Sequence, residues 1–108
     1  DVAGADVILV DDIADTAGTL CRAADIIMEK GAKSVQALIT HPVLSGNAYE
    51  NINNSKLSKM IVTDTIPLDE KGLVLKDEGR IEVLSVAELL ATGIKSIHDE
   101  TSVSFLFI

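Results

Sequence analysis

The sequence predicts an α/β fold with a mainly parallel sheet and flanking helices. Short apolar runs rich in β-branched residues alternate along the chain with segments whose apolar residues recur at helical spacing. Strands and helices that alternate in this way form parallel sheets with right-handed crossovers. A chain of 108 residues has room for one core, so we expect a single domain over residues 1–108.

The strand predictions rest on short apolar runs that end at polar residues or proline. We predict four strands, over residues 7–10, 34–40, 59–63 and 81–84. The first is continuously apolar, which suits a strand covered on both faces, and it stops at Asp11 and Asp12. The second ends at His41-Pro42, because proline cannot donate a hydrogen bond to a strand ladder.

The helix predictions rest on apolar spacing and on end signals. We predict helices over residues 20–30, 45–54 and 85–97. The last begins with a capping-box pattern, Ser85-Val86-Ala87-Glu88. Its apolar face is expected to be buried through Val86, Leu90, Ile94 and Ile97. Residues 64–80 mix proline, glycine and charge and predict a surface excursion, and residues 101–108 predict a terminal strand or tail.

Composition excludes several functions. Nine basic against 17 acidic residues give a net charge of −8, and three aromatic residues offer no stacking surface, so nucleic acid is not an expected partner. No apolar run exceeds four residues, which excludes a membrane span. The single cysteine, Cys21, and the lack of a signal-peptide pattern predict a cytoplasmic protein. Because the chain begins at Asp1 without methionine, we expect a piece of a longer polypeptide.

One segment combines carboxylates, hydroxyls and glycine. Ligands of parallel sheets bind beyond the carboxyl ends of the strands, which points first to residues 11–19, then to 41–46 and 63–67. A helix start offers free N–H groups, so residues 16–19 could wrap a phosphate, with Gly18 allowing close approach. The three carboxylates repel phosphate but can accept hydrogen bonds from sugar hydroxyls or coordinate magnesium.

A structural interpretation competes with this functional one. Asp15 or Thr16 could simply cap the helix, and Gly18 could serve close packing. Asp11 and Asp12 could be a solvated strand end, although opposite-facing neighbours on a strand are expected to do different jobs. Each residue alone favours the structural interpretation, whereas the whole string at the end of a buried strand favours function.

The segment also resembles a known family. Residues 7–19 resemble the phosphoribosyl-pyrophosphate signature of the type I phosphoribosyltransferase fold. Their particular sequence is similar to the form of this signature in ribose-phosphate pyrophosphokinases. Three further stretches are similar to the same family: Thr40-His41-Pro42 with Ser45-Gly46, residues 62–67, and residues 102–107. The resemblance covers nearly the whole chain, and residues 68–80 depart from it.

The resemblance implies an activity and a set of site residues. Family members transfer the β,γ-pyrophosphoryl group of Mg-ATP to the 1-hydroxyl of ribose 5-phosphate, which makes phosphoribosyl pyrophosphate for nucleotide biosynthesis. The implied 5-phosphate ligands are Asp15, Thr16, Ala17, Gly18 and Thr19. Asp11, with Asp12, would hold the ribose hydroxyls or the Mg²⁺ around them.

The resemblance also implies what this chain lacks. It places the ATP-binding residues, the magnesium-binding histidine and aspartate, and the mobile Lys/Arg catalytic loop upstream. We therefore expect the chain to be the C-terminal half of a longer enzyme, without a catalytic residue of its own and inactive alone. With a net charge of −8, affinity for a sugar phosphate must come from local donors and magnesium.

The end of the chain carries a regulatory expectation. In regulated members, a terminal Ser-x-Ser-x-x-Phe region contributes to an allosteric site for ADP or phosphate at a subunit interface, which would place Ser102, Ser104 and Phe107 there. The alternative is a plain amphipathic edge strand. The resemblance implies a homo-oligomer, or a hetero-oligomer with paralogues. A noncatalytic regulatory paralogue and a true phosphoribosyltransferase are the alternative functions.

Overall fold

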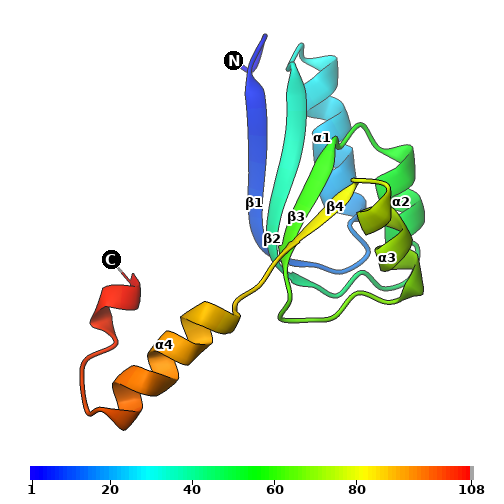
Figure 1. The fold of residues 1–108 in the computed structure, drawn as a ribbon. Coiled ribbons are helices and arrows are strands. Elements are labelled where there is room, and N and C mark those ends of the chain that lie inside the picture. The colour runs from blue at the N-terminus through cyan, green and yellow to red at the C-terminus, as the bar shows by residue number, and fades with distance from the viewer. Residues whose placement is uncertain (108) are drawn as a thin grey trace.

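The computed structural model describes residues 1–107 and confirms the predicted α/β class (Figure 1). The elements in chain order are β1 (Asp6–Ala14), α1 (Gly18–Glu29), β2 (Ser34–Pro42), α2 (Ala48–Asn54), β3 (Lys59–Thr63), α3 (Glu70–Asp77), β4 (Ile81–Leu84), α4 (Ala87–His98) and the short 3-10 helix η1 (Ser104–Phe107). The four strands pair in parallel in the order β1-β2-β3-β4. All of them therefore end at the same edge of the sheet.

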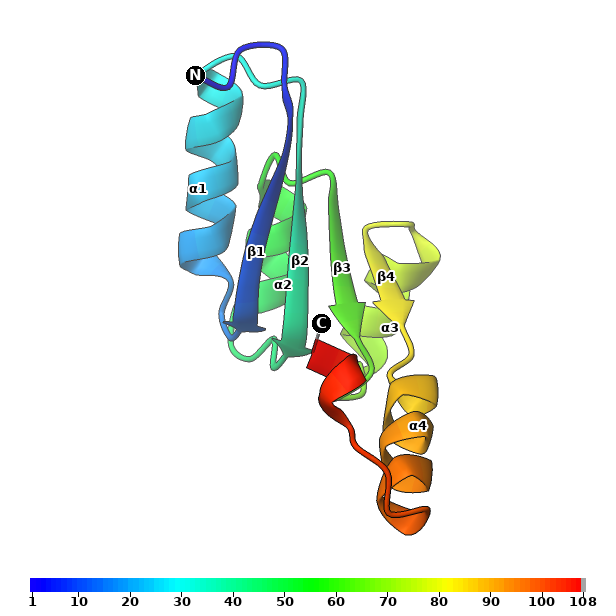
Figure 2. The same cartoon turned by 90° about the vertical axis from the view of Figure 1, so that its left-hand side faces the viewer.

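The core lies between one face of the sheet and the helices α1, α2 and α3, which Figures 1 and 2 show on that face. Alternate residues of β2 and β3 point into it, and α2 contributes Ile52. The largest of the fully buried side chains are Val35, Pro42, Ile52, Leu57, Met60, Val62 and Ile81. None of the helices in the described part of the chain is long and apolar enough to span a membrane.

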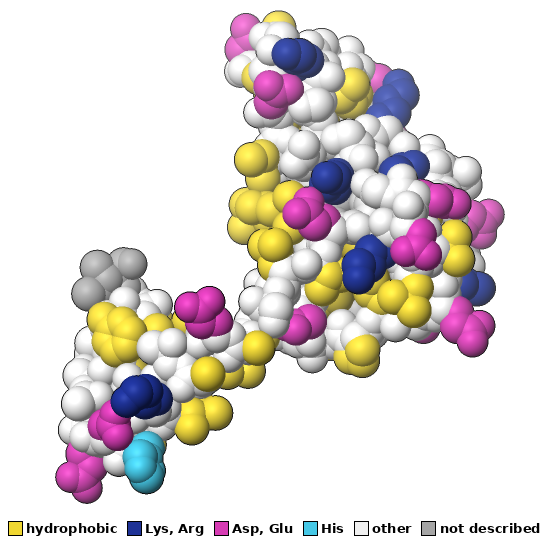
Figure 3. Space-filling model, viewed as in Figure 1, with side chains coloured by type: hydrophobic (Ala, Val, Ile, Leu, Met, Phe, Trp, Pro, Cys, Tyr) yellow, Lys and Arg dark blue, Asp and Glu magenta, His cyan; other side chains and the backbone are white. Residues whose placement is uncertain are grey.

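The expectation that the first strand is covered on both faces is wrong for residues 1–107. Ile8 and Val10 point away from the helices, and Val10 is 76% exposed. Figure 3 shows hydrophobic side chains gathered at this border of the sheet and again along α4. The apolar run signals a strand, but its continuity does not say which element covers the second face. The strand also runs on past the aspartates to Ala14, because an edge strand can carry polar residues in contact with water.

Residues 64–80 are not only a surface excursion, because they include α3. Asp69 caps this helix, and its carboxylate accepts a hydrogen bond of 3.0 Å from the N–H group of Gly72. Leu75 is buried in the core, whereas its neighbours Leu73 and Val74 remain exposed. Three consecutive apolar residues show no helical spacing, so the pattern hides the single one that packs.

The predicted burial of the last helix is also wrong. The apolar face of α4 has no cover within residues 1–107: Leu90, Ile94 and Ile97 are exposed, and Figure 1 shows the helix projecting away from the sheet. The capping box does not form: Val86, not Ser85, is the N-cap residue, and the N-cap side chain makes no capping hydrogen bond to the first turn of the helix. Spacing identifies an apolar face without identifying what packs against it.

Two smaller features differ from the sequence-based expectations. The second strand continues through His41 and Pro42 rather than ending before them. The chain end forms η1 instead of a strand, and the hydroxyl of Ser102 accepts a hydrogen bond from the N–H group of Ser104 at its start. Residue 108 lies outside the described residues.

The contrast between Leu75 and Val74 can be tested directly. Leu75 is 2% exposed and Val74 is 55% exposed, although they are neighbours on the same helix. We expect Leu75→Ala to lower the free energy of unfolding by about 2–5 kcal/mol, because it leaves a cavity. The matched control Val74→Ala should change it by less than about 1 kcal/mol. Urea unfolding of the chain measures both, and equal effects would contradict the packing of α3.

A second prediction concerns Tyr49, whose pKa is raised to about 12 by burial and by its hydrogen bond to the Asp69 carboxylate. Because this pKa lies above the ordinary value of about 10, the contribution of Tyr49 to stability is present below pH 10 and is lost as the pH rises toward 12. The chain has one tyrosine and no tryptophan, so ultraviolet absorbance reports this phenol alone.

The variant Asp69→Asn should lower the pKa of Tyr49 but leave it above 10, because burial is the larger cause of the shift. Asp77→Asn, on the same helix, is the control and should leave the titration where it is in the unmodified chain. A titration curve that does not move in Asp69→Asn would show that the contact between phenol and carboxylate is not formed.

Candidate functional site

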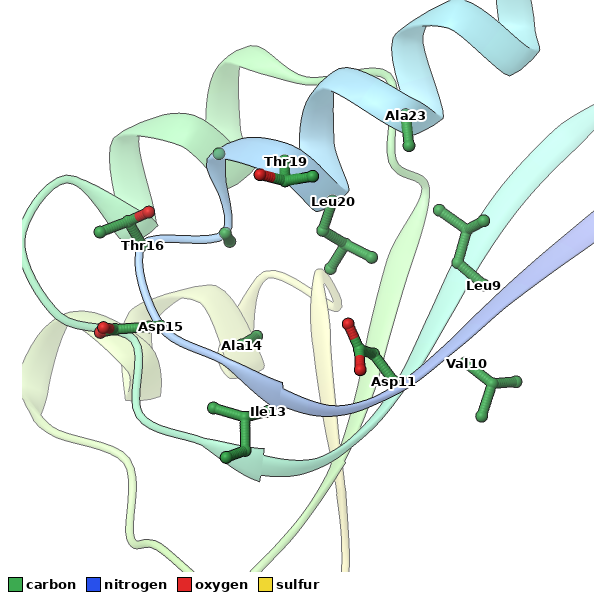
Figure 4. Close-up of a pocket in the computed structure, with 12 residues that line it drawn as sticks. Leu9, Val10, Asp11, Ile13, Ala14, Asp15, Thr16, Thr19, Leu20 and Ala23 are labelled. Atoms are coloured by element: carbon green, nitrogen blue, oxygen red, sulfur yellow. The ribbon is translucent and has the colours of Figure 1, made fainter.

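A cavity of about 380 Å³ lies where β1 passes into α1 (Figure 4). Its lining residues come from the end of β1, the connecting loop and the first turns of α1: Leu9, Val10, Asp11, Ile13, Ala14, Asp15, Thr16, Ala17, Gly18, Thr19, Leu20 and Ala23. Six of the seven site residues expected from the sequence are in this set, and Asp12 is not. The structure thus brings nearly all of the predicted segment around one hollow.

The start of α1 presents unpaired backbone donors to this cavity. Ala17 is the N-cap residue, and no side chain caps the helix, so the interpretation of Asp15 or Thr16 as the helix cap is wrong. Within residues 1–107, the N–H groups of residues 16–19 meet no acceptor. Free N–H groups and the positive end of the helix dipole together favour an anion at this point.

The two neighbouring aspartates fall on opposite sides of the strand. Asp11 lines the cavity, and Figure 4 shows its carboxylate pointing toward Leu20. It also accepts a hydrogen bond of 2.8 Å from the N–H group of Asp12. The pleat of β1 therefore separates the two residues, as alternation along a strand requires.

The connection between β2 and α2 donates hydrogen bonds to the loop between β1 and α1. The N–H group of Leu44 donates to the carbonyl of Ala14 at 3.0 Å, and that of Ser45 donates to the carbonyl of Asp15 at 3.1 Å. The Ser45 hydroxyl also donates to the Asp15 carboxylate. This carboxylate points away from that of Asp11 in Figure 4. Asp15 therefore has a protein partner at the cavity wall.

A residue of α2 adds one more contact to the loop. The side-chain amide of Asn51 donates to the carbonyl of Thr16 at 2.9 Å. The sequence offers no signal for this contact, because Asn51 lies 35 positions away in a polar helix and belongs to no motif. Only the packing of α2 against α1 reveals it.

The other two segments that the strand-end rule selects do not line the cavity. At the ends of β2 and β3, the Nδ1 atom of His41 lies 2.8 Å from the Thr65 hydroxyl. The hydroxyls of Thr63 and Thr65 both donate to the carbonyl of Thr40. Asp64 accepts the N–H group of Val86 at 2.9 Å, which lowers the pKa of its carboxyl. These residues tie the strand ends together.

The C-terminal residues are apart from the cavity. Ser102, Ser104 and Phe107 are exposed, and Figure 1 shows η1 well away from the start of α1. Phe107 is 84% exposed, and the hydroxyls of the two serines hydrogen-bond to each other at 2.8 Å. The structure does not bring these residues and the loop into one site.

Within residues 1–107, neither a basic side chain nor a cluster of metal-binding side chains lines the cavity. No lysine or arginine is among its lining residues, and the described part of the chain holds no group of three His, Cys, Asp or Glu side chains that could bind a metal. Among residues 1–107, the groups at the cavity that can donate hydrogen bonds to an anion are therefore uncharged.

A parallel α/β sheet whose first strand leads through an Asp-Asp-Ile-Ala-Asp-Thr-Ala-Gly-Thr segment into a helix with open N–H groups defines a type I phosphoribosyltransferase-like domain. A family model described as the phosphoribosyl synthetase-associated domain matches residues 1–108. The chain belongs to this family.

Named relatives agree with this assignment. The chain is 54% identical over 108 residues to a ribose-phosphate pyrophosphokinase of Xanthomonas axonopodis pv. citri. The matched region is 100% of this chain and 33% of that protein. It is 49% identical over 100 residues to ribose-phosphate pyrophosphokinase 3 of Saccharomyces cerevisiae. This matched region is 93% of this chain and 30% of that relative.

A solved structure is similar as well. The crystal structure of phosphoribosylpyrophosphate synthetase from Mycobacterium smegmatis superposes with a TM-score of 0.82 at 37% identity, over 93% of this chain and 32% of that one. The chain therefore spans about a third of the length of the relatives it matches.

Proposed function

We propose that this chain is the ribose 5-phosphate-binding part of a ribose-phosphate diphosphokinase, a transferase of nucleotide biosynthesis. The observation that carries the proposal is the cavity at the start of α1. Residues 15–19 line it in succession, and their N–H groups from residue 16 onward have no acceptor within residues 1–107. The relatives are named ribose-phosphate pyrophosphokinases, which supports transfer of a pyrophosphoryl group to a ribose phosphate. The resemblance of residues 7–19 to this family implies that ATP is the donor and ribose 5-phosphate the acceptor.

The 5-phosphate would lie against residues 15–19. The N–H groups there have no acceptor within residues 1–107, and the hydroxyls of Thr16 and Thr19 border the same cavity. Asp11 would accept hydrogen bonds from the ribose hydroxyls, because its carboxylate lines the cavity next to the loop. Asp12 would act from the other side of the strand.

Asp11 also fits a magnesium ion. Mg²⁺ is usually held by one or two carboxylates, with substrate phosphates and waters as its other ligands, so it does not need the cluster of three that the described residues lack. When bound, the ion would neutralise the charge that develops on the phosphates during transfer. Asp12 lies on the opposite side of β1 and does not line the cavity, so it would act on the ion through its charge, without coordinating it.

The remaining parts of the enzyme would come from outside this chain. We infer that residues 1–108 alone make no product from ATP, since no lysine or arginine lines the cavity. We also propose that Ser102, Ser104 and Phe107 form part of an effector site for ADP or phosphate between subunits, because they are exposed and free to contact another subunit. A cytoplasmic homo-oligomer, or a hetero-oligomer with paralogues, fits this proposal.

The proposal is tested by adding ribose 5-phosphate to the ¹⁵N-labelled chain and following its amide signals by NMR. We expect the largest shifts at residues 16–19. Gly18→Ala should weaken binding by about tenfold, a cost of about 1.4 kcal/mol, because the added methyl group beside the Thr16 hydroxyl would hinder the close approach of the phosphate to the backbone.

The same variant should leave the fold unharmed. A Cβ at Gly18 would lie 3.7 Å from the Thr16 hydroxyl and 3.8 Å from the Asn51 amide, which are ordinary contacts. Gly93→Ala, in α4 and with a similarly open surrounding, is the control and should bind like the unmodified chain. A folded chain that shows no shifts at residues 16–19 in saturating ribose 5-phosphate would refute the proposal.

A further inference from the structure

Three consecutive carbonyl groups before α1 are all occupied by donors from one segment. The carbonyls of Ala14, Asp15 and Thr16 accept hydrogen bonds from Leu44, Ser45 and Asn51 respectively. The next carbonyl, that of Ala17, accepts the N–H group of Cys21 within α1. Every carbonyl of the loop thus has a protein donor, and the N–H groups of residues 16–19 are the ones left for a ligand.

The last of these three contacts differs in kind from the first two. Leu44 and Ser45 donate through their backbones, whereas Asn51 donates through its side chain. It does so at the peptide group that precedes Ala17, which has a left-handed conformation with φ of 60°. A residue with a side chain pays about 1–2 kcal/mol for this conformation, so the peptide group needs an external restraint to keep its orientation.

We propose that Asn51 is a positioning residue for phosphate binding. Its amide fixes the Thr16–Ala17 peptide group, so that the N–H groups of residues 17–19 converge on the position of the phosphate. This inference rests on the proposed function, and it extends the binding site to a residue that does not line the cavity. Asn51 would act through the loop and not touch the substrate.

The position of Asn51 separates this role from a structural one. The side chains by which α2 is anchored in the core are Ala48 and Ile52, whereas Asn51 is only half-buried. The C-terminal end of α2 is held independently, because the Arg80 guanidinium donates to the carbonyl of Ile52 at 2.7 Å. Removing the Asn51 amide therefore leaves the main attachments of α2 in place.

The test compares three variants of the chain. Asn51→Leu keeps the size of the side chain and removes the donor. Asn51→Gln keeps the donor on a longer side chain, and a cavity of about 220 Å³ beside residue 51 has room for the extra methylene group. Asn54→Leu is the matched control, because Asn54 borders the same cavity but makes no hydrogen bond to the loop within residues 1–107.

The readouts are amide chemical shifts in the free chain, titrations with ribose 5-phosphate and with inorganic phosphate, and the urea unfolding midpoint. We expect Asn51→Leu to shift the amide signals of residues 17–19 in the absence of ligand. The variant should also lower the affinity for both ligands by about tenfold. Asn51→Gln should restore most of the affinity, and Asn54→Leu should match the unmodified chain in both respects.

The outcomes separate this inference from the proposed function. If the unmodified chain binds ribose 5-phosphate and Asn51→Leu binds it equally well, Asn51 is not a positioning residue and the proposed function stands. If all three variants lose affinity together with their unfolding midpoint, the effect is general damage and the inference fails. If the unmodified chain binds neither ligand, the proposed function fails; unshifted signals at residues 17–19 in Asn51→Leu then overturn the inference as well.

Discussion

The register between β1 and β2 is the constraint on which the site depends. Parallel pairing sets Asp11 opposite Ile39 and Ala14 opposite Pro42, so both strands reach the same edge and their connections leave it side by side. Only this register lets the segment after β2 reach the carbonyls of the loop after β1. A slip of one residue would also turn Asp11 out of the cavity, because the side-chain period of a strand is two.

The fold was predictable as far as local patterns determine it. Each strand and the helices α1, α2 and α4 left a signature of apolar spacing, and the parallel order follows from their alternation. The signature of α3 was absent, since Leu75 is flanked by two exposed apolar residues. The exposure of Ile8, Val10 and the apolar face of α4 could not be predicted either. Apolar spacing describes one element, whereas burial depends on a second element that the pattern does not contain.

The site divides in the same way. Residues 11–19 are contiguous, so the sequence could identify them as a unit, and alternation correctly separated Asp11 from Asp12. The contacts of Ser45 and Asn51 span 30 and 35 positions and join side chains of ordinary type to backbone or carboxylate oxygens. Such contacts depend on how α2 packs beside α1, and a single sequence does not encode that placement in any local pattern.

The charge of the chain explains why the backbone is important here. The net charge is −8, and no lysine or arginine of the described residues lines the cavity, so the charges of this chain do not favour the approach of a phosphate. Peptide N–H groups can compensate only when several point at one anion, because each carries a fraction of a charge. Their strength therefore depends on orientation more than that of a lysine would. If the domain binds a phosphate through its backbone, as we propose, the backbone must be held rigidly, and the donors of residues 44–51 would provide that rigidity.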